Sequence, residues 1–395
     1  MDLKQRAKER IELDKPSLIA LSHKIFGNPE LAYEEHNSSA WLVEALRDGG
    51  MQVEFPAHGL ETAFRATAGT KGPHIVICAE YDALPEIGHA CGHNIIGTSA
   101  VGAGLALSQL ADDLGMRVSV LGTPAEEGGG GKVELLRRGA FEDVDVSLMV
   151  HPGPMDVVDI PTLAVGVVQI TYRGKESHAS AFPELGRNAL DAINIAYVAI
   201  AALRQHIRPT ERIHGIVTHG GDAPNIVPKL TKARYYIRGK DLEDLVELKE
   251  RVMRCFEAGA LATGCELETY WEGHDYAPVI TNAPLAEIYD RNVRALGRDP
   301  IPRAVVERYA GSTDMGNVSM VLPSIHPLMS IDSLPAVNHQ AEFAEHTISP
   351  AGDKAITDAA LAMAWTVIDL VTTPGALEEA KASFEAGPPD SGLRL

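Results

Sequence analysis

The chain has 395 residues, of which 45% are hydrophobic and 23% charged, a composition typical of a globular protein with room for two domains. A formal net charge of −19 disfavours nucleic acid and anionic membrane surfaces as partners. The four cysteines are too few and too scattered for a disulfide framework, and no apolar run resembles a signal peptide or a membrane span. We therefore expect a cytoplasmic protein without nucleic-acid or membrane partners.

The first part of the chain alternates short apolar runs with helical stretches, which predicts βαβ units in an α/β fold. It opens with two helices, over residues 2–26 with an interruption near Pro16 and over residues 34–47. Strands are then predicted at residues 63–67, 74–79, 117–122 and 144–150, and helices at residues 95–110 and 133–138. Sheets of this kind place their ligands beyond the carboxyl ends of the strands.

The middle of the chain has a different order. Strands at residues 162–172, 213–219, 233–238 and 266–271 and helices at residues 188–205 and 242–263 give the β-α-β-β-α-β order of a ferredoxin-like unit. The first pattern then resumes with a helix ending near Leu296, a strand near residues 325–331 and a long helix over residues 352–371. The tail after Pro374 is short, and we expect disorder from Pro388 onward. We predict a discontinuous α/β domain, residues 1–162 and 275–395, carrying an inserted α+β domain, residues 163–274.

Three of the predicted strands lead into residues of the types that bind metals. In chain order these residues are Glu80, Asp82, Cys91, His93, Glu126, Glu127 and His151. Each one alone also fits an ordinary role: a buried cysteine at a turn, a solvated acidic turn or a core histidine. Because they recur at the same topological position, the pattern predicts a metal site.

The residue types at these strand ends indicate what the site could do. Cys91 and His93 flank Gly92, and a thiolate with an imidazole suits zinc, or less tightly manganese or cobalt. In the pair Glu126-Glu127 one carboxylate could bind metal while the other moves protons. The glycine run before Lys132 resembles a phosphate-binding loop, but Val133 replaces the Ser or Thr that such a loop needs. The chain also lacks His-Glu-x-x-His and Gly-x-Ser-x-Gly motifs, which excludes two common hydrolase designs.

Three segments carry a resemblance to a known family. AEYDALP (79–85) and GHACGHN (88–94) resemble the dinuclear-metal peptidases and amidohydrolases that include aminoacylase, carboxypeptidase G and the plant auxin-conjugate hydrolases. GSTDMGNVS (311–319) is similar to the branch of aminobenzoyl-glutamate hydrolases and β-alanyl-lysine dipeptidases. The resemblance extends over residues 19–369. It implies a mixed-sheet, zinc-peptidase-like catalytic domain with an inserted ferredoxin-like dimerisation, or lid, domain.

The resemblance also implies roles for single residues. Glu126 is the expected general base, and Asp82 is expected to orient the metal ligands or a catalytic group. His339, placed in a His-x-x-x-Phe context, is preferred over His346 as the last ligand. The implied ligands of two divalent ions, zinc foremost with manganese or cobalt as alternatives, are Cys91, His93, Glu127, His151 and His339.

In the inserted domain, the segment GKESHA (174–179) resembles a motif whose histidine reaches the active site of the partner subunit. His178 would then act in trans within a homodimer. Asn225 and Arg238 match residues that hold the carboxylate of the substrate, and Arg offers a planar fork for that purpose. Ser312 and Thr313 are further expected substrate contacts.

The sequence departs from the wider family at two positions. Many members have a histidine ligand where Glu80 stands, so no ligand role is carried over to Glu80, and Asn94 replaces an aspartate of the auxin-conjugate hydrolases. We interpret the other histidines near the motifs as structural or supporting. These are His89, His214, His219 and His326.

Together these observations predict a metal-dependent amidohydrolase that cleaves the amide bond of N-acyl amino acids, aminobenzoyl-glutamate or dipeptides by metal-activated water. The substrate is expected to be a small molecule with a free carboxylate. Two alternatives stay open: a deacylase of an N-acetyl or N-succinyl diamino acid, and a catalytically silent dimeric ligand-binding protein.

Overall fold

The computed structural model describes residues 2–308 and 310–387. The chain divides into two compact units, the first built from residues up to 161 and from 279 onward, the second from residues 162–278. The second unit is therefore an insertion, and each unit has a hydrophobic core of its own.

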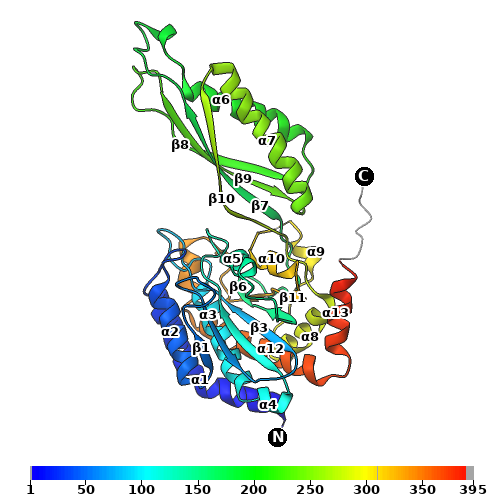
Figure 1. Cartoon of the computed structure of the whole chain (residues 1–395). Coiled ribbons are helices and arrows are strands. Elements are labelled where there is room, and N and C mark those ends of the chain that lie inside the picture. The colour runs from blue at the N-terminus through cyan, green and yellow to red at the C-terminus, as the bar shows by residue number, and fades with distance from the viewer. Residues whose placement is uncertain (1, 309, 388–395) are drawn as a thin grey trace. The chain divides into compact units, whose positions relative to one another are not determined.

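A mixed sheet lies at the centre of the first unit (Figure 1), with strand order β1-β2-β4-β3-β5-β11. Its strands are β1 (Gln52–Glu54), β2 (Phe64–Ala68), β3 (His74–Ala79), β4 (Arg117–Gly122), β5 (Val146–Leu148) and β11 (Ser324–Ile325). The four strands β4, β3, β5 and β11 run parallel, and β2 and β1 are added antiparallel at one edge. A short parallel pair, β6 (His151–Gly153) and β12 (Leu328–Ser330), follows β5 and β11 in the chain. The predicted mixed α/β sheet is confirmed.

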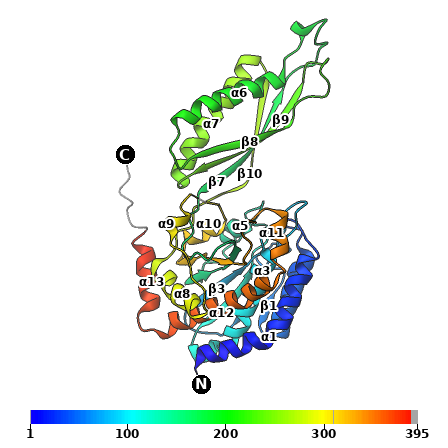
Figure 2. The same ribbon diagram turned by 180° about the vertical axis from the view of Figure 1, so that it is seen from behind.

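Helices cover both faces of this sheet, because the apolar residues of its strands alternate between two cores. Ile75 and Ile77 of β3 face the core shared with α1 (Leu3–Phe26), α3 (His93–Ser108) and α12 (Pro350–Thr372). Val76 and Cys78 face the opposite core with α10 (Met315–Ser319) and α5 (Gly131–Arg137). Figure 2 shows α12 and α1 lying across the first of these faces. The other helices of the unit are α2 (His36–Asp48), α4 (Ala111–Leu114), α8 (Ala283–Ala295), α9 (Arg303–Val306), α11 (Ala341–His346) and α13 (Ala376–Glu385).

Three details of the prediction were wrong. Helix α1 continues through Pro16, since Ile11 and Leu18 on either side are both buried and their packing outweighs the lost hydrogen bond. The strand expected at residues 144–150 is shorter, because β5 covers only Val146–Leu148 and β6 begins beyond the predicted range at His151. The strand expected at residues 325–331 is two short strands, β11 and β12, interrupted at Pro327. The prediction did not include α13, which lies in the short tail beyond Pro374 and packs its buried Ala376 and Ala380 on the core. The disorder expected from Pro388 lies outside the described residues.

The sequence analysis expected no apolar run resembling a membrane span. By length and composition alone, however, helix α12 could cross a membrane. Of its most apolar stretch, however, 78% is buried inside the first unit, where α12 packs against α1, α3 and α8. A core helix surrounded by protein passes the same test of apolar length as a membrane span. The helix is thus accounted for by the packing of this unit.

The inserted unit is a four-stranded antiparallel sheet of order β10-β7-β9-β8, with α6 and α7 side by side on one face (Figure 1). Its elements are β7 (Ala164–Arg173), α6 (Ala189–Leu203), β8 (Arg212–His219), β9 (Leu230–Gly239), α7 (Leu242–Thr263) and β10 (Glu266–Tyr276), with short 3₁₀ turns at Pro183–Leu185 and Arg204–His206. This is the β-α-β-β-α-β order expected of a ferredoxin-like unit. Strand β8 forms one edge of the sheet.

Candidate metal centre

The residues of metal-binding type gather at one edge of the central sheet. Strands β4, β3 and β5 are adjacent and parallel, so the segments that follow them leave from the same side. Glu80 and Asp82 follow β3, Glu126 and Glu127 follow β4, and His151 begins β6 directly after β5.

The five predicted ligands form two groups that share Cys91. The ligand atoms of Cys91, His93 and His151 lie within 4.8 Å of one another, and so do those of Cys91, Glu127 and His339. Cys91 Sγ is 3.4 Å from His151 Nε2, and Glu127 Oε1 is 3.4 Å from His339 Nε2. Because Cys91 belongs to both groups, its thiol is the ligand that two neighbouring cations would share.

Hydrogen bonds turn the ring nitrogens of the two buried histidines toward this centre. The Nδ1–H of His93 donates to Asp82 Oδ1 at 2.9 Å, and the Nδ1–H of His151 donates to the carbonyl of Pro152 at 2.7 Å. Each neutral ring then presents the lone pair of Nε2, the form in which imidazole binds a metal. Asp82 also accepts the backbone N–H of Glu127 at 2.9 Å, so one carboxylate orients two of the candidate ligands.

Local backbone geometry explains how Cys91 and His93 reach the same point. Gly92 has a φ of 85°, in the left-handed region, and a Cβ added there would lie 2.3 Å from the ring of Pro152. His339 also has a positive φ, 69°, and its N–H donates to the carbonyl of Ala90 at 2.9 Å. Strained backbone of this kind persists where the surrounding structure requires it, often at functional sites.

Buried atoms without a hydrogen-bond partner test whether a cation fits here. Among the described residues, His93 Nε2 and Glu127 Oε1 are buried and accept no hydrogen bond. Buried polar atoms are almost always satisfied, so these two indicate a missing positive partner. Cys, His and carboxylate ligands form a donor set that zinc favours. The residues present therefore fit divalent metal ions.

Glu126 occupies a buried position beside this centre, in the group that its carboxylate forms with Glu80 and His93. Burial, together with the carboxylates of Glu80 and Glu127, raises the pKa of Glu126 well above its usual value. A carboxylate whose proton affinity is raised in this way suits a group that accepts a proton during a reaction.

A buried glutamate that the sequence analysis did not single out holds the loop before Glu126. Glu35, at the start of α2, accepts the N–H of Ala125 at 2.8 Å and the hydroxyl of Thr62 at 2.9 Å. Ala125 has a φ of 60°, unusual for a residue with a side chain, and its carbonyl accepts the N–H groups of Gly129 and Gly130. Glu35 therefore positions the loop that carries Glu126. No motif surrounds it in the sequence, so no signal could have identified it.

Replacing Glu35 with Gln is expected to stabilise the protein at pH 8 and to change its stability little near pH 4.5. Burial, followed by the nearby carboxylate of Asp82, raises the pKa of Glu35 from 4.5 to about 7. The unfolded chain ionises first, so the wild type loses stability as the pH rises from 4.5 to 7, by up to about 3 kcal/mol. Gln avoids this loss. The melting temperatures of both proteins at the two pH values measure this loss of stability. The control is Glu44→Gln, at an exposed position on α2. A pH-independent difference would contradict a raised pKa of Glu35.

The structure separates the preferred ligand from its neighbours. His339 joins the candidate centre, whereas His346 is in none of the three groups found in the described residues. Asn94 donates to the hydroxyl of Ser22 on α1 at 2.9 Å, which gives it a structural contact. His326 is buried with its ring 5.5 Å from that of His151, so it lies beside the candidate ligands.

The remaining predicted residues are not members of the ligand groups found among the described residues. His178, Asn225 and Arg238 belong to the inserted unit. His178 and Asn225 are neighbours, because the N–H of Ala179 donates to the carbonyl of Asn225 at 3.0 Å. Thr313 is buried, and its hydroxyl accepts the N–H of Met315 at the start of α10. Ser312 is half-buried, and a substrate contact for either residue stays a prediction.

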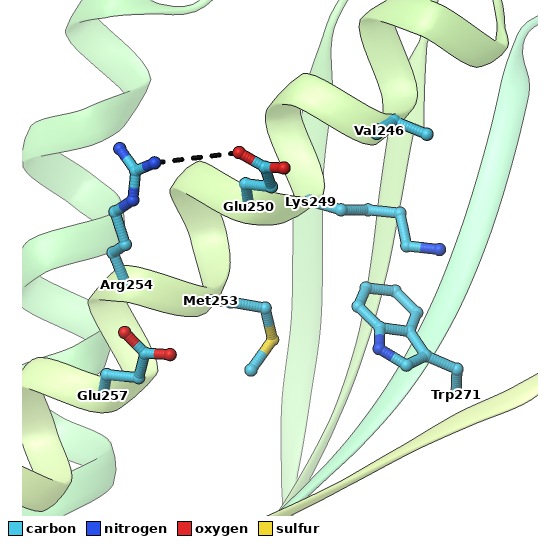
Figure 3. A pocket seen from close by; sticks show the side chains of 7 residues that line it. All are labelled: Val246, Lys249, Glu250, Met253, Arg254, Glu257 and Trp271. Carbon is cyan, nitrogen blue, oxygen red and sulfur yellow. Dashed lines mark ion pairs between the residues drawn. The ribbon is translucent and has the colours of Figure 1, made fainter.

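The inserted unit has a surface hollow of about 500 Å³ whose lining includes none of the predicted site residues (Figure 3). It is lined by Val246, Lys249, Glu250, Met253, Arg254, Glu257 and Trp271. Three of its four charged groups are paired: Lys249 Nζ is 2.8 Å from Asp275 and 3.7 Å from the centre of the Trp271 ring, and Arg254 pairs with Glu250. The hollow therefore offers paired surface charges, in contrast to the converging ligands of the candidate metal centre.

The fold and the site define a metal-dependent hydrolase of the kind built from a catalytic domain with an inserted dimerisation domain. Residues 76–360 match peptidase family M20/M25/M40, and the chain belongs to this family. It is 42% identical to the Xaa-Arg dipeptidase of Mus musculus, over 97% of this chain and 92% of that protein. It is 33% identical to a p-aminobenzoyl-glutamate hydrolase component of Escherichia coli, over 66% of this chain and 58% of that protein.

Solved structures share the fold. A Bacillus subtilis protein, YXEP, described as a dinuclear metal binding peptidase of the M20 family, superposes with a TM-score of 0.70 at 20% identity, over 92% of this chain and 99% of that one. An aminobenzoyl-glutamate utilization protein from Klebsiella pneumoniae gives a TM-score of 0.72 at 16% identity, over 91% and 97% of the two chains. The predicted family is confirmed, and its hydrolase members support a metallopeptidase or amidohydrolase.

Proposed function

We propose that this protein is a dinuclear metal-dependent dipeptidase that hydrolyses small dipeptides with a free C-terminal carboxylate. The observation that carries the proposal is the convergence of Cys91, His93, Glu127, His151 and His339 beside the buried Glu126. The similarity to an Xaa-Arg dipeptidase over nearly the whole chain supports a dipeptide as substrate. The relation to an aminobenzoyl-glutamate hydrolase supports aminobenzoyl-glutamate as the second candidate. Four unpaired cysteines are in keeping with a cytoplasmic location.

Each residue at the centre has a role in this proposal. The five ligands would hold two divalent ions, with zinc favoured by the thiol and imidazole groups. When bound, the ions would lower the pKa of a water molecule and polarise the scissile carbonyl. Glu126 accepts the proton of the attacking water and passes it to the leaving amine. Asp82 keeps His93 and the backbone of Glu127 in place throughout.

His178 is held in the tautomer that can donate to a carbonyl oxygen. Its Nδ1 accepts the backbone N–H groups of Ser180, at 3.3 Å, and Ala181, at 3.1 Å. The neutral ring must then carry its hydrogen on Nε2, where it is available to stabilise a developing oxyanion.

The positions of the substrate-binding residues favour a site shared between two subunits. Asn225 adjoins the end of the sheet where β9 begins at Leu230, and Arg238 lies at the other end of β9, opposite Val165. These ends are roughly 25 Å apart, at about 3.3 Å per residue of strand. One carboxylate cannot contact both residues of a single chain. The proposal therefore requires Arg238 from one subunit, and Asn225 with His178 from its partner.

An apolar surface on the inserted unit provides a place for the second copy. Strand β8 pairs with β9 on one side, and the described residues place no strand on its other side. Ile216 of β8 is 66% exposed and Val198 of α6 is 69% exposed, with Tyr197 and Val217 also exposed. Arg204, directly after α6, donates to the carbonyl of Ile213 on β8 at 2.9 Å, so the two elements adjoin. An uncovered edge strand next to exposed apolar side chains suits a two-fold contact with an identical surface.

Chelation is expected to abolish hydrolysis, and about two equivalents of Zn²⁺ or Mn²⁺ per chain are expected to restore it. The purified protein would be analysed for metal content, stripped, and assayed on a panel of dipeptides, including Xaa-Arg, with aminobenzoyl-glutamate and N-acetyl amino acids. Matched peptides with an amidated C-terminus serve as controls, because they lack the carboxylate. Undiminished turnover after complete metal removal, or equal turnover of the amidated peptides, would contradict the proposal.

A further inference from the structure

Two motifs with no role in the proposed function meet at one buried lysine. Lys132 ends the glycine run after Glu127, and Asp314 lies in the segment GSTDMGNVS. The ammonium of Lys132 donates to Asp314 Oδ1 at 2.7 Å and to Glu80 Oε1, and its backbone N–H donates to Asp314 Oδ2 at 2.9 Å. All three side chains are fully buried. We call Glu80, Lys132 and Asp314 the buried triad.

The glycine run has a packing role in bringing Lys132 to this position. A Cβ added at Gly131 would lie 1.7 Å from the carbonyl oxygen of Pro124, so the chain can pass there only without a side chain. The glycine run therefore allows Lys132 to reach the buried triad. This packing role accounts for a glycine run that resembles a phosphate-binding loop.

The buried triad carries one positive and two negative charges. Both oxygens of Asp314 accept hydrogen bonds from Lys132, and Glu80 Oε1 accepts a third. Glu80 Oε2 is buried and, among the described residues, accepts no hydrogen bond. Burying an uncompensated charge is unfavourable, so the surplus negative charge at this oxygen calls for a cation that the triad itself does not supply.

The unpartnered oxygen of Glu80 faces a candidate metal ligand. Glu80 Oε2 lies 3.4 Å from His93 Nε2, and neither atom has a hydrogen-bond partner among the described residues. If the His93 ring is neutral, its Nδ1–H goes to Asp82 and its Nε2 carries a lone pair, so that two electron-rich atoms face one another. Two ligand atoms that each lie about 2.1 Å from one tetrahedral ion are about 3.4 Å apart.

From this geometry we infer that Glu80 is a metal ligand through Oε2, bound to the same ion as His93, and that Lys132 and Asp314 hold it in position. The inference rests on the proposed dinuclear site and adds a ligand to it. The competing explanation is a proton on His93 Nε2 that pairs with Glu80 in place of a metal.

Two substitutions in the triad distinguish these explanations, because each removes one negative charge and leaves Lys132 with one carboxylate. Glu80→Gln alters the side chain that contacts His93, and Asp314→Asn alters the side chain whose two oxygens both accept hydrogen bonds from Lys132. Stripped full-length proteins would be titrated with Zn²⁺ against a chromophoric chelator and with Co²⁺ in visible absorption. We expect Glu80→Gln to weaken one of the two metals by at least about tenfold and to change the Co²⁺ spectrum, and Asp314→Asn to stay within about threefold of wild type.

Unchanged affinity and spectrum in Glu80→Gln would overturn the inference and favour the proton. Equal losses in both variants would also overturn it, since the triad would then act through charge or packing. Circular dichroism of the stripped proteins checks folding, and Glu80→Asp, which keeps the charge but withdraws the oxygen, gives the same expected loss should Gln fail to fold. A wild type that binds no metal would instead refute the proposed function, so the two failures are distinct.

Discussion

Replacing Glu126 with Gln is expected to lower kcat by about 10²–10⁴-fold while the metal content stays at the wild-type level. The amide has nearly the shape of the carboxylate, but it cannot accept a proton from the attacking water. Steady-state kinetics on the best dipeptide, together with metal analysis of the same preparation, measure both quantities.

The neighbouring residue provides the matched control. Glu127 Oε1 lies 3.4 Å from His339 Nε2, within the candidate ligand set, so Glu127→Gln is expected to lose metal along with activity. Two identical changes at adjacent positions should thus give different metal contents. Full activity in Glu126→Gln, or a metal loss equal to that of Glu127→Gln, would show that the roles of the two carboxylates are assigned incorrectly.

Mixing two inactive variants, His178→Ala and Glu126→Gln, is expected to restore about a quarter of wild-type activity. After random subunit exchange half of the dimers are mixed, and each mixed dimer contains one site with an intact Glu126 and an intact His178 from the other chain. Activity after co-refolding or co-expression, with subunit exchange verified by differential tags, gives the answer.

The opposite ends of β9 make the control for this experiment specific. His178→Ala and Arg238→Ala should also complement, because the proposed site takes Arg238 from one chain and His178 from the other. His178→Ala and Asn225→Ala should not, because these two residues adjoin and serve the same site. No recovery between His178→Ala and Arg238→Ala would indicate a site completed within a single chain. Recovery between His178→Ala and Asn225→Ala would show that these two residues serve different sites.

The sequence alone predicts those parts of the fold that local patterning determines. Strand β3 and strand β4 have the predicted bounds, because their apolar runs are buried on both faces and end at sharp turns. The five candidate ligands are also found together, because parallel strands bring their carboxyl ends to one edge and the motifs adjoin those ends. His339 required the resemblance to a family, since nothing local distinguishes it from His346.

The supporting residues could not be predicted, because their roles depend on contacts between distant segments. Glu35 acts through Ala125 and Lys132 acts through Asp314, pairs that only the folded chain brings together. The same reason explains the continuous α1, where packing of Ile11 and Leu18 decided against a local signal at Pro16. The roles of Glu35 and Lys132 and the continuity of α1 all depend on burial and on contacts between distant segments, which the sequence does not display.

The insertion of one unit within the other has a consequence for the order in which a new chain matures. Four of the five candidate ligands emerge from the ribosome before residue 162, and the inserted unit, contiguous in sequence, can fold while synthesis continues. His339 and α12, which packs on α1 and α3, are translated only after the inserted unit. The core around the first four candidate ligands therefore stays incomplete until the last part of the chain is made. We expect metal loading to follow at that late stage of biogenesis.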